Sequence, residues 1–465
     1  MTRNVFIGTT SSKIQRLRIM DDAEHYDERD TVIDPEGGLA MIDDEDEFEE
    51  MMELMMEISS GMLEKLNDRK VQLRGIQAYV SLLTAVPSVT LVKKKKVLKK
   101  TQGIKRVLRA MMSHPHFKLL IYEGLVFIGH TACLSGQLKE SLLNNGAMKI
   151  CAKSTVEWYK QFVIVTAGLS ATFQLMADSA IGLSKAENLQ GLQVLLCQLL
   201  RHYGQETSGE RSNDVLEGIF EITALFRNKR VKYEDLLKLC LDWLGHFNSS
   251  SNNSNYRVFN KCLNAVGNLT YSHAMNRELA VHKGILQIVT SALHNQYNIE
   301  TCVSSMIVLN NLSQSQNILI ESLLIGDGER LLALVIETIK ISHFVMNSAA
   351  LNLISNLCLN DRLRQMCLDR GLMDLLESDG MSKRFQGRHN RRYKKFEGRR
   401  KRCIDVLTIK STEEKQLIQA ELQVERETQQ QLYYREEYTG RRMRIGLTGK
   451  LSPKDKKSES NGVVE

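Results

Sequence analysis

A regular spacing of glycines is the feature that most constrains how this chain of 465 residues can fold. Each glycine precedes a short apolar segment, as in GIKRVLRAMM, GAMKICA, GLQVLLCQLL and GILQIVTSAL. The steps between these glycines are 42, 43, 45, 93, 44 and 43 residues, and the step of 93 corresponds to two periods with one glycine missing. A period of this length is typical of a solenoid, in which stacked copies bury a shared core. The glycines are Gly61, Gly103, Gly146, Gly191, Gly284, Gly328 and Gly371.

The stretch from Phe259 to Asn295 shows what one period contains. Its pattern predicts three short helices, and the middle one is closed by Gly284, which can adopt the positive φ that ends a helix. None of the three can bury its apolar side alone. The chain has only four prolines and 6% aromatic residues, which favours helices over sheets. The sequence therefore predicts an all-α protein.

Two of these periods carry a family resemblance. The segments ALNLISNLCLNDRLRQMCLDRGLMDLL and NAVGNLTYSHAMNRELAVHKGILQIV resemble armadillo repeats, whose third helix ends in A-L-x-x-L-x-N-L. The resemblance is good over about 215–380 and weaker over 60–215, where the Asn-Leu pairs are missing. It implies a right-handed α-solenoid (superhelix) of six to seven armadillo-like repeats over 58–380. The spacing leaves HEAT repeats open, although the glycine between helices favours armadillo.

Asparagines recur on the predicted third helices. In the armadillo family these helices line a concave groove, and the resemblance implies that the terminal asparagines hold the backbone of an extended peptide. A carboxamide suits this role because it offers both a donor and an acceptor. The alternative is that the asparagines only cap or end helices. The candidate partner-binding residues are Asn260, Asn264, Asn268, Asn311, Asn352 and Asn356.

The tryptophans of nuclear-import receptors in this family are missing here. Those receptors place a Trp four residues before the groove asparagine, but this chain has Asn264, Ile307 and Asn352 at the corresponding positions. Binding of a basic import signal in that manner is therefore not predicted.

The net charge of +7 is distributed unevenly. Residues 383–402 hold eleven Lys and Arg against one Glu, which leaves −3 for the other 445 residues and suggests that the basic character lies in this segment. Three interpretations remain open: contact with nucleic-acid phosphates, a nuclear-localisation signal, or contact with an acidic partner, including the chain's own acidic run at 43–53. The candidate residues are Arg391, Arg392, Lys394, Lys395, Arg399, Arg400, Lys401 and Arg402.

The remaining segments complete the predicted organisation. Nine cysteines without a C-x-x-C pair, and the absence of an apolar run of about 20 residues, favour the cytoplasm and/or the nucleus. Residues 1–20 faintly resemble a mitochondrial presequence, which leaves that compartment as an alternative. The predicted segments are a disordered N-terminal arm with an acidic run (1–57), the solenoid (58–380), a basic linker (381–410), a C-terminal helix (411–438) and a disordered tail (439–465).

No catalytic constellation emerges from the sequence. GLTGKL near the C-terminus lacks the phosphate-loop spacing, and no metal-ligand cluster accompanies His114 and His116. His130, on an apolar helix, is typical of a core or groove histidine. We therefore expect no enzyme, no cofactor and no metal, but a protein-binding scaffold or adaptor that holds extended partner segments in its groove. The alternative is a nucleic-acid-associated protein that uses 383–402. No oligomeric state is predicted.

Overall fold

The structure is a computed structural model, and every regular element among its described residues is a helix. No helix in the described part of the chain is both long and apolar enough to cross a membrane. The described residues are 45–84, 89–205, 210–226, 233–249, 256–271, 273–295, 298–314, 328–340, 343–378, 390–409, 414, 416–420 and 422.

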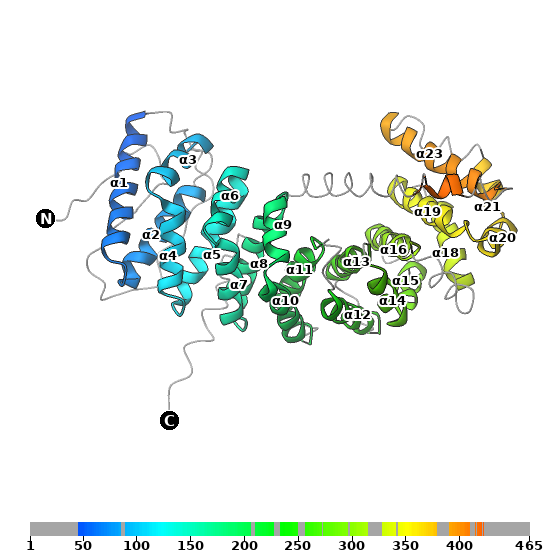
Figure 1. The fold of residues 1–465 in the computed structure, drawn as a ribbon, viewed down its shortest axis with the longest axis horizontal. Helices are drawn as coiled ribbons and strands as arrows, with labels where there is room; N and C mark the ends of the chain where they lie inside the picture. Colours follow the sequence, from blue (N-terminus) through cyan, green and yellow to red (C-terminus); the bar gives the residue numbers. More distant parts are fainter. Residues whose placement is uncertain are drawn as a thin grey trace, which may run out of the picture. The chain divides into compact units, whose positions relative to one another are not determined.

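These residues form two compact units, divided between Lys185 and Ala186. The helices of both units are labelled in Figure 1. The continuity of one solenoid across 58–380, and its right-handed superhelix, therefore stay predictions. Helix α9 (Ala180–Glu187) crosses the division. The helices of unit 1 are α1 (Glu45–Glu64), α2 (Arg69–Thr84), α3 (Leu91–Lys100), α4 (Gly103–Ser113), α5 (Lys118–Leu134), α6 (Gly136–Asn144), α7 (Ala147–Glu157) and α8 (Phe162–Met176).

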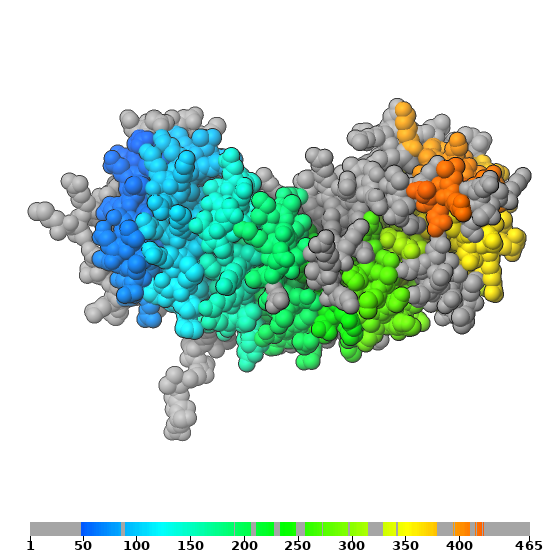
Figure 2. Space-filling model, viewed as in Figure 1, coloured from blue at the N-terminus to red at the C-terminus, as the bar shows by residue number. Residues whose placement is uncertain are grey.

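Unit 1 is built from repeats of three helices, such as α3–α4–α5 and α6–α7–α8. The last helices of its repeats pack in succession, α2 on α5 and α5 on α8, while α1, α4 and α7 cover them. The repeats form successive bands from blue to cyan in Figure 2. The turn before α4 and the turn before α7 both need a left-handed residue, which is Gln102 in the first (φ 52°) and Gly146 in the second (φ 84°).

A glycine on each last helix of unit 1 receives a side chain from the preceding helix layer. A Cβ atom at Gly124 would lie 2.5 Å from the Sδ atom of Met111. A Cβ atom at Gly75 would likewise clash with the Met62 side chain, and one at Gly168 with the Thr155 side chain. Because these are interior helical positions, where glycine is unfavourable, close helix packing is the reason for them.

Unit 2 repeats the same plan, with α14–α15–α16 and α20–α21–α23 as three-helix repeats. Its last helices pack in the order α11, α13, α16, α19 and α23. Gly284 and Gly371 take positive φ values of 82° and 70° before α15 and α21, as the sequence predicts. The helices are α10 (Gln190–Tyr203), α11 (Glu210–Thr223), α12 (Glu234–Ser249), α13 (Tyr256–Tyr271), α14 (Ala274–His282), α15 (Ile285–His294), α16 (Ile299–Leu312), α18 (Gly328–Lys340), α19 (Phe344–Leu357), α20 (Asp361–Asp369), α21 (Leu372–Glu377) and α23 (Asn390–Leu407).

Two expected boundaries are corrected at the N-terminal side. The arm predicted to be disordered as far as residue 57 includes the first turns of α1, which begins at Glu45. Phe48, Met52 and Met55 on this helix are buried, so the acidic run starts a packed helix. Gly61, expected to precede a helix, lies inside α1, where nothing lies within 4 Å of a Cβ built at this position.

The basic linker predicted for 381–410 is also wrong over 390–407, which form α23. This helix packs on α19 and α21 as the last helix of a repeat. Phe396, Cys403, Val406 and Leu407 are buried, which is enough to hold the helix although the segment looks too polar in sequence. Most of the predicted helix at 411–438 lies outside the described residues, of which 414, 416–420 and 422 are helical.

Candidate partner-binding site

The last helices of unit 2 share one partly exposed face, which we call the third-helix face. On α13 this face is formed by Arg257, Lys261, Asn264 and Asn268, of which Arg257 is exposed and the others are half-buried. Their spacing of three to four residues places them on one side of the helix. Two of the candidate asparagines, Asn264 and Asn268, therefore share this face of α13 with two cations.

Ion pairs hold the two cations against the neighbouring helix α11. Arg257 Nη2 lies 2.7 Å from Glu217 Oε1, and Lys261 Nζ lies 2.6 Å from Glu221 Oε1. Burial raises the pKa of the Glu221 carboxyl, and the nearby Lys261 ammonium opposes that rise. Sequence reasoning missed these pairs. The available signal was the i, i+4 spacing of two acids on one helix and two cations on the next, 40 residues apart.

Three of the predicted asparagines bond to the preceding repeat. Asn268 Nδ2 donates to the Ala224 carbonyl oxygen at 2.9 Å, and Asn311 Nδ2 donates to that of Gly267 at 2.8 Å. Asn356 Nδ2 continues the series two repeats after Asn268, with bonds to Asn310 Oδ1 at 2.7 Å and Ser313 Oγ at 3.2 Å. Each amide thus joins two successive last helices. A role in gripping a partner stays a prediction for these residues.

Asn260 faces the next repeat and not the third-helix face. Its Oδ1 accepts a bond of 2.6 Å from Thr301 Oγ1, and Asn298 at the start of α16 lies beside it. The physical reason is the helix period: eight residues exceed two turns, so Asn260 and Asn268 point in directions that differ by about 80°. A spacing of i, i+4, i+8 therefore does not keep three side chains on one narrow stripe.

Asn264 and Asn352 remain accessible at equivalent positions on α13 and α19. Both are half-buried, and so is Ile307, which occupies the same position on α16 between them. The three residues are 43 and 45 positions apart, close to one repeat each. Because α13, α16 and α19 pack in succession, these side chains form a row of amide, aliphatic and amide groups across the third-helix face.

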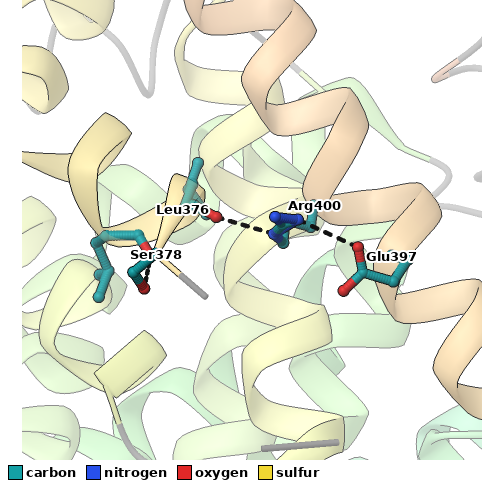
Figure 3. Close-up of polar contacts among 5 residues, drawn as sticks. Leu376, Ser378, Glu397 and Arg400 are labelled. Atoms are coloured by element: carbon teal, nitrogen blue, oxygen red, sulfur yellow. Dashed lines mark hydrogen bonds and ion pairs between the residues drawn. The ribbon is translucent and has the colours of Figure 1, made fainter. Parts of the chain in front are cut away.

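The basic candidates on α23 are divided between packing and solvent. Arg400 Nε donates to the Leu376 carbonyl oxygen at 2.8 Å, and its Nη1 lies 3.2 Å from Glu397 Oε2 (Figure 3). This arginine therefore caps the end of α21. Lys394 and Lys401 are exposed. The side chains of Arg391, Arg392 and Lys395 lie outside the described residues.

Arg399 and Arg402 are half-buried on the same helix. Burial lowers the pKa of the Arg399 guanidinium to about 10, and the nearby positive charge of Arg402 adds to this effect. A guanidinium in such a place is less available to a phosphate than the exposed ammonium groups of Lys394 and Lys401.

The histidines singled out in the sequence occupy structural positions. His114 Nε2 lies 2.9 Å from the Leu66 carbonyl oxygen, and burial together with Lys94 lowers the pKa of His130. Among the described residues, no group of three or more His, Cys, Asp or Glu side chains is arranged to hold a metal ion.

The chain is similar in fold to solved helical-repeat structures. An engineered protein solved by the Northeast Structural Genomics Consortium superposes with a TM-score of 0.57 at 13% identity, over 80% of this chain and 93% of that one. A structure from a study of a phosphorylation switch in the interaction between cadherin and beta-catenin superposes with a TM-score of 0.56 at 13% identity, over 86% of this chain and 80% of that one. No family model and no curated protein matches the sequence. The similarity defines a helical-repeat fold.

Proposed function

We propose that the chain is a non-enzymatic protein-binding scaffold of the armadillo type, which holds an extended partner segment along the third-helix face of unit 2. Its similarity in fold to a structure from a study of cadherin and beta-catenin gives weak support. The observation that carries the proposal is the row formed by Asn264, Ile307 and Asn352.

The spacing of this row suits an extended polypeptide. Packed helices lie about 8–10 Å apart, and an extended chain advances about 3.3 Å per residue, so each repeat would face roughly three partner residues. The amides of Asn264 and Asn352 can then pair with backbone groups of the partner, while Ile307 contacts a side chain between them. Arg257 and Lys261 add positive charge beside the row, although Glu217 and Glu221 offset it.

The test uses a random peptide library displayed on phage and selected on the intact chain. Peptides that bind the wild-type protein should bind the variant Asn264→Ala/Asn352→Ala about 30-fold more weakly, because two hydrogen bonds of about 1 kcal/mol each are lost. The variant should keep the helicity of the wild type and a cooperative unfolding transition, since both side chains are half-buried.

A matched control removes two amides elsewhere in the same unit. Gln287 on α15 and Gln365 on α20 are exposed, and neither lies on a last helix. The variant Gln287→Ala/Gln365→Ala should retain all selected peptides. Equal loss in both variants, or no loss in either, would show that the third-helix face does not bind the peptides.

The structure supports the alternative, a nucleic-acid site in the basic segment 383–402, less than it supports the third-helix face as a protein-binding site. Arg399, Arg400 and Arg402 are half-buried on α23, which leaves Lys394 and Lys401 as its exposed cations among the described side chains. If nucleic-acid binding were the function, affinity would fall log-linearly with salt and disappear in Lys394→Gln/Lys401→Gln.

A further inference from the structure

Unit 1 has a basic region that the average charge conceals. From Arg69 to Tyr122 the sequence contains 13 Lys and Arg and no Asp or Glu. The acidic residues at 43–68 offset this charge, so the conclusion that basic character lies only in 383–402 is wrong. The structure shows where these cations lie.

The outer face of α4 has two cations and one apolar side chain in a row. Counting from the left-handed residue Gln102, they occupy the third, seventh and tenth positions, which are Lys105, Arg109 and Met112. All three are exposed, and Met112 has 61% of its surface accessible. Steps of four and three residues keep them on one side of the helix.

The outer face of α7 repeats this arrangement at the same offsets. Counting from the left-handed residue Gly146, the third, seventh and tenth positions are Lys149, Lys153 and Val156, and all three are exposed. Helices α4 and α7 pack side by side (Figure 1), so the two rows are neighbours. A single exposed apolar residue on a protein surface needs no explanation. Here the same arrangement of two cations and one apolar residue recurs in two adjacent repeats, so the exposure of Met112 is part of a pattern.

Helix α3 packs on α4 and carries further exposed cations. Its Lys99 and Lys100 are exposed, and Val92 has 75% of its surface accessible. Lys94 points inward, where its Nζ donates to the Leu83 carbonyl oxygen at 2.9 Å. Lys96 lies 3.4 Å from Glu49 on α1, so the acidic run contacts α3. Val92 and Met112 are the most exposed large apolar side chains in the described part of unit 1.

The cations of this face differ from Lys96, which pairs with Glu49. None of them forms an ion pair with another residue that the structure describes. The outer basic face comprises Lys99, Lys100, Lys105, Arg109, Lys149 and Lys153, with Val92, Met112 and Val156 among them.

We propose that this outer basic face of unit 1 docks on an anionic lipid surface. The cations lie on three adjacent helices and so form a two-dimensional array, which matches a membrane better than a single extended strand. Clusters of four to eight basic residues attract anionic headgroups, and exposed apolar side chains beside them enter the headgroup boundary. The long lysine stems allow both contacts at once.

The composition of the face argues against a nucleic acid as the occupant. Helices α3, α4 and α7 contain no aromatic residue on which a base could stack. Phosphate contacts also give no reason for the apolar residues Val92, Met112 and Val156 to be exposed among the cations.

The test is co-sedimentation of the intact chain with lipid vesicles. The chain should bind vesicles made of equal parts phosphatidylcholine and phosphatidylserine, but not vesicles of phosphatidylcholine alone. Lys105→Gln/Arg109→Gln and Lys149→Gln/Lys153→Gln should each weaken binding about 25-fold, because each basic side chain near such a surface contributes about fivefold. Met112→Ser/Val156→Ser should weaken it about fivefold.

The matched control is Lys394→Gln/Lys401→Gln, which removes the same charge from α23. It should bind the mixed vesicles within about twofold of wild type, since neither lysine lies on the outer basic face. Thermal unfolding checks that every variant folds. The proposal is overturned if the intact chain ignores mixed vesicles or if the control loses as much binding as the α4 and α7 variants.

A parallel arm offers the chain a single-stranded DNA oligonucleotide and polyglutamate in solution. Binding of either one that is tighter than vesicle binding, depends on Lys105 and Arg109, and is unchanged in Met112→Ser/Val156→Ser would overturn the lipid assignment. That outcome would identify a nucleic acid or an acidic protein as the occupant.

Discussion

In unit 1, glycines on the last helices leave space for side chains of the preceding helix in the same repeat, whereas in unit 2 amides and ion pairs join the last helices of successive repeats. Gly124 and Gly168 in unit 1 leave space for Met111 and Thr155. Asn268 and Asn311 in unit 2 bond to the backbone of the preceding repeat. The two kinds of contact are thus close packing within a repeat in unit 1 and directional bonds between repeats in unit 2.

The two units also expose different groups. In unit 1, exposed cations lie on the outer helices α3, α4 and α7. The amide contacts of unit 2 require asparagines on the last helices, and the neighbouring positions Asn264 and Asn352 remain accessible there. The two proposed surfaces therefore lie on different helix layers of the two units.

The largest expected effect on stability comes from α23, the last described helix of unit 2 that packs on α19. The contact between α23 and α19 includes the rings of Phe396 and Phe344, whose centroids lie 6.2 Å apart. Phe396 is 0% exposed, so Phe396→Ala should destabilise unit 2 by about 3–5 kcal/mol. Urea unfolding followed by Trp243 fluorescence in a Trp158→Phe background measures unit 2, since the chain has only these two tryptophans.

The exposed Lys394 on the same helix provides the control. Lys394→Ala should change the free energy of unfolding by less than about 0.5 kcal/mol. A similarly small effect of Phe396→Ala would mean that α23 is the unpacked basic linker expected from its sequence.

The second prediction concerns the glycine contacts of unit 1. Gly168→Ala brings a methyl group against the Thr155 side chain, and the overpacking should cost about 1–3 kcal/mol. Gly129→Ala is the matched control, because a Cβ there would lie 3.8 Å from the nearest atom, the Ala171 Cα. The control should stabilise the unit by up to about 1 kcal/mol through helix propensity.

Trp158 fluorescence in a Trp243→Phe background reports the unfolding of unit 1. The double variant Thr155→Ala/Gly168→Ala should recover part of the lost stability, because the hydroxyl that meets the new methyl group is gone. If the two glycine variants behave alike, close packing is not the reason for Gly168.

The third prediction concerns the amide contacts of unit 2. Asn311 is 6% exposed, and Asn311→Ala removes its bond to the Gly267 carbonyl, at a cost of about 1–2 kcal/mol. Asn264→Ala, on the neighbouring helix, should cost less than about 0.5 kcal/mol, since Asn264 is half-buried. Urea unfolding measures the free energy of unfolding of both variants. Equal losses would mean that asparagines that join two repeats do not differ in their contribution to stability from those on the third-helix face.

Much of the fold was predictable because the regular spacing of glycines along the sequence indicates structural repeats. The positive φ of Gly284 and Gly371 follows from glycine at the end of a short helix, a local property that sequence shows directly. The asparagines were also found, but their roles were not. Whether Asn311 faces a partner or the preceding repeat depends on helix rotation and on a carbonyl 44 residues away.

The packing of α23 and the basic region of unit 1 were not predicted, because composition and net charge averaged over a segment conceal them. α23 looks unable to pack, since its few apolar residues are diluted by arginines, yet Phe396, Cys403 and Val406 are buried. The basic region from Arg69 to Tyr122 is concealed by the acidic run before it. In both cases the outcome depends on which side of a helix each residue occupies. The number of charged or apolar residues in a segment does not show this.

The smallest expected effects are pH dependences of opposite sign in the two units. Burial, with Lys94 nearby, lowers the pKa of His130 on α5 below its ordinary value of 6.5. The folded unit 1 then binds fewer protons than the unfolded chain, so its stability falls as the pH drops below 6.5 toward the folded pKa. Burial raises the pKa of Glu221 on α11 above its ordinary value of 4.5. Its contribution to the stability of unit 2 is full below 4.5 and is lost as the pH rises through the folded pKa.

Two substitutions isolate these contributions. His130→Gln should flatten the fall in unit 1 stability between about pH 7 and pH 5, and Glu221→Gln should flatten the opposite trend in unit 2. Amide hydrogen exchange of α5 and α11 at the two pH values, corrected for intrinsic exchange rates, measures each unit separately. Because Lys261 pairs with Glu221, Lys261→Met should raise the carboxyl pKa further and steepen the trend in unit 2. A shift of the two units in the same direction would mean that their contrast does not extend to their buried charges.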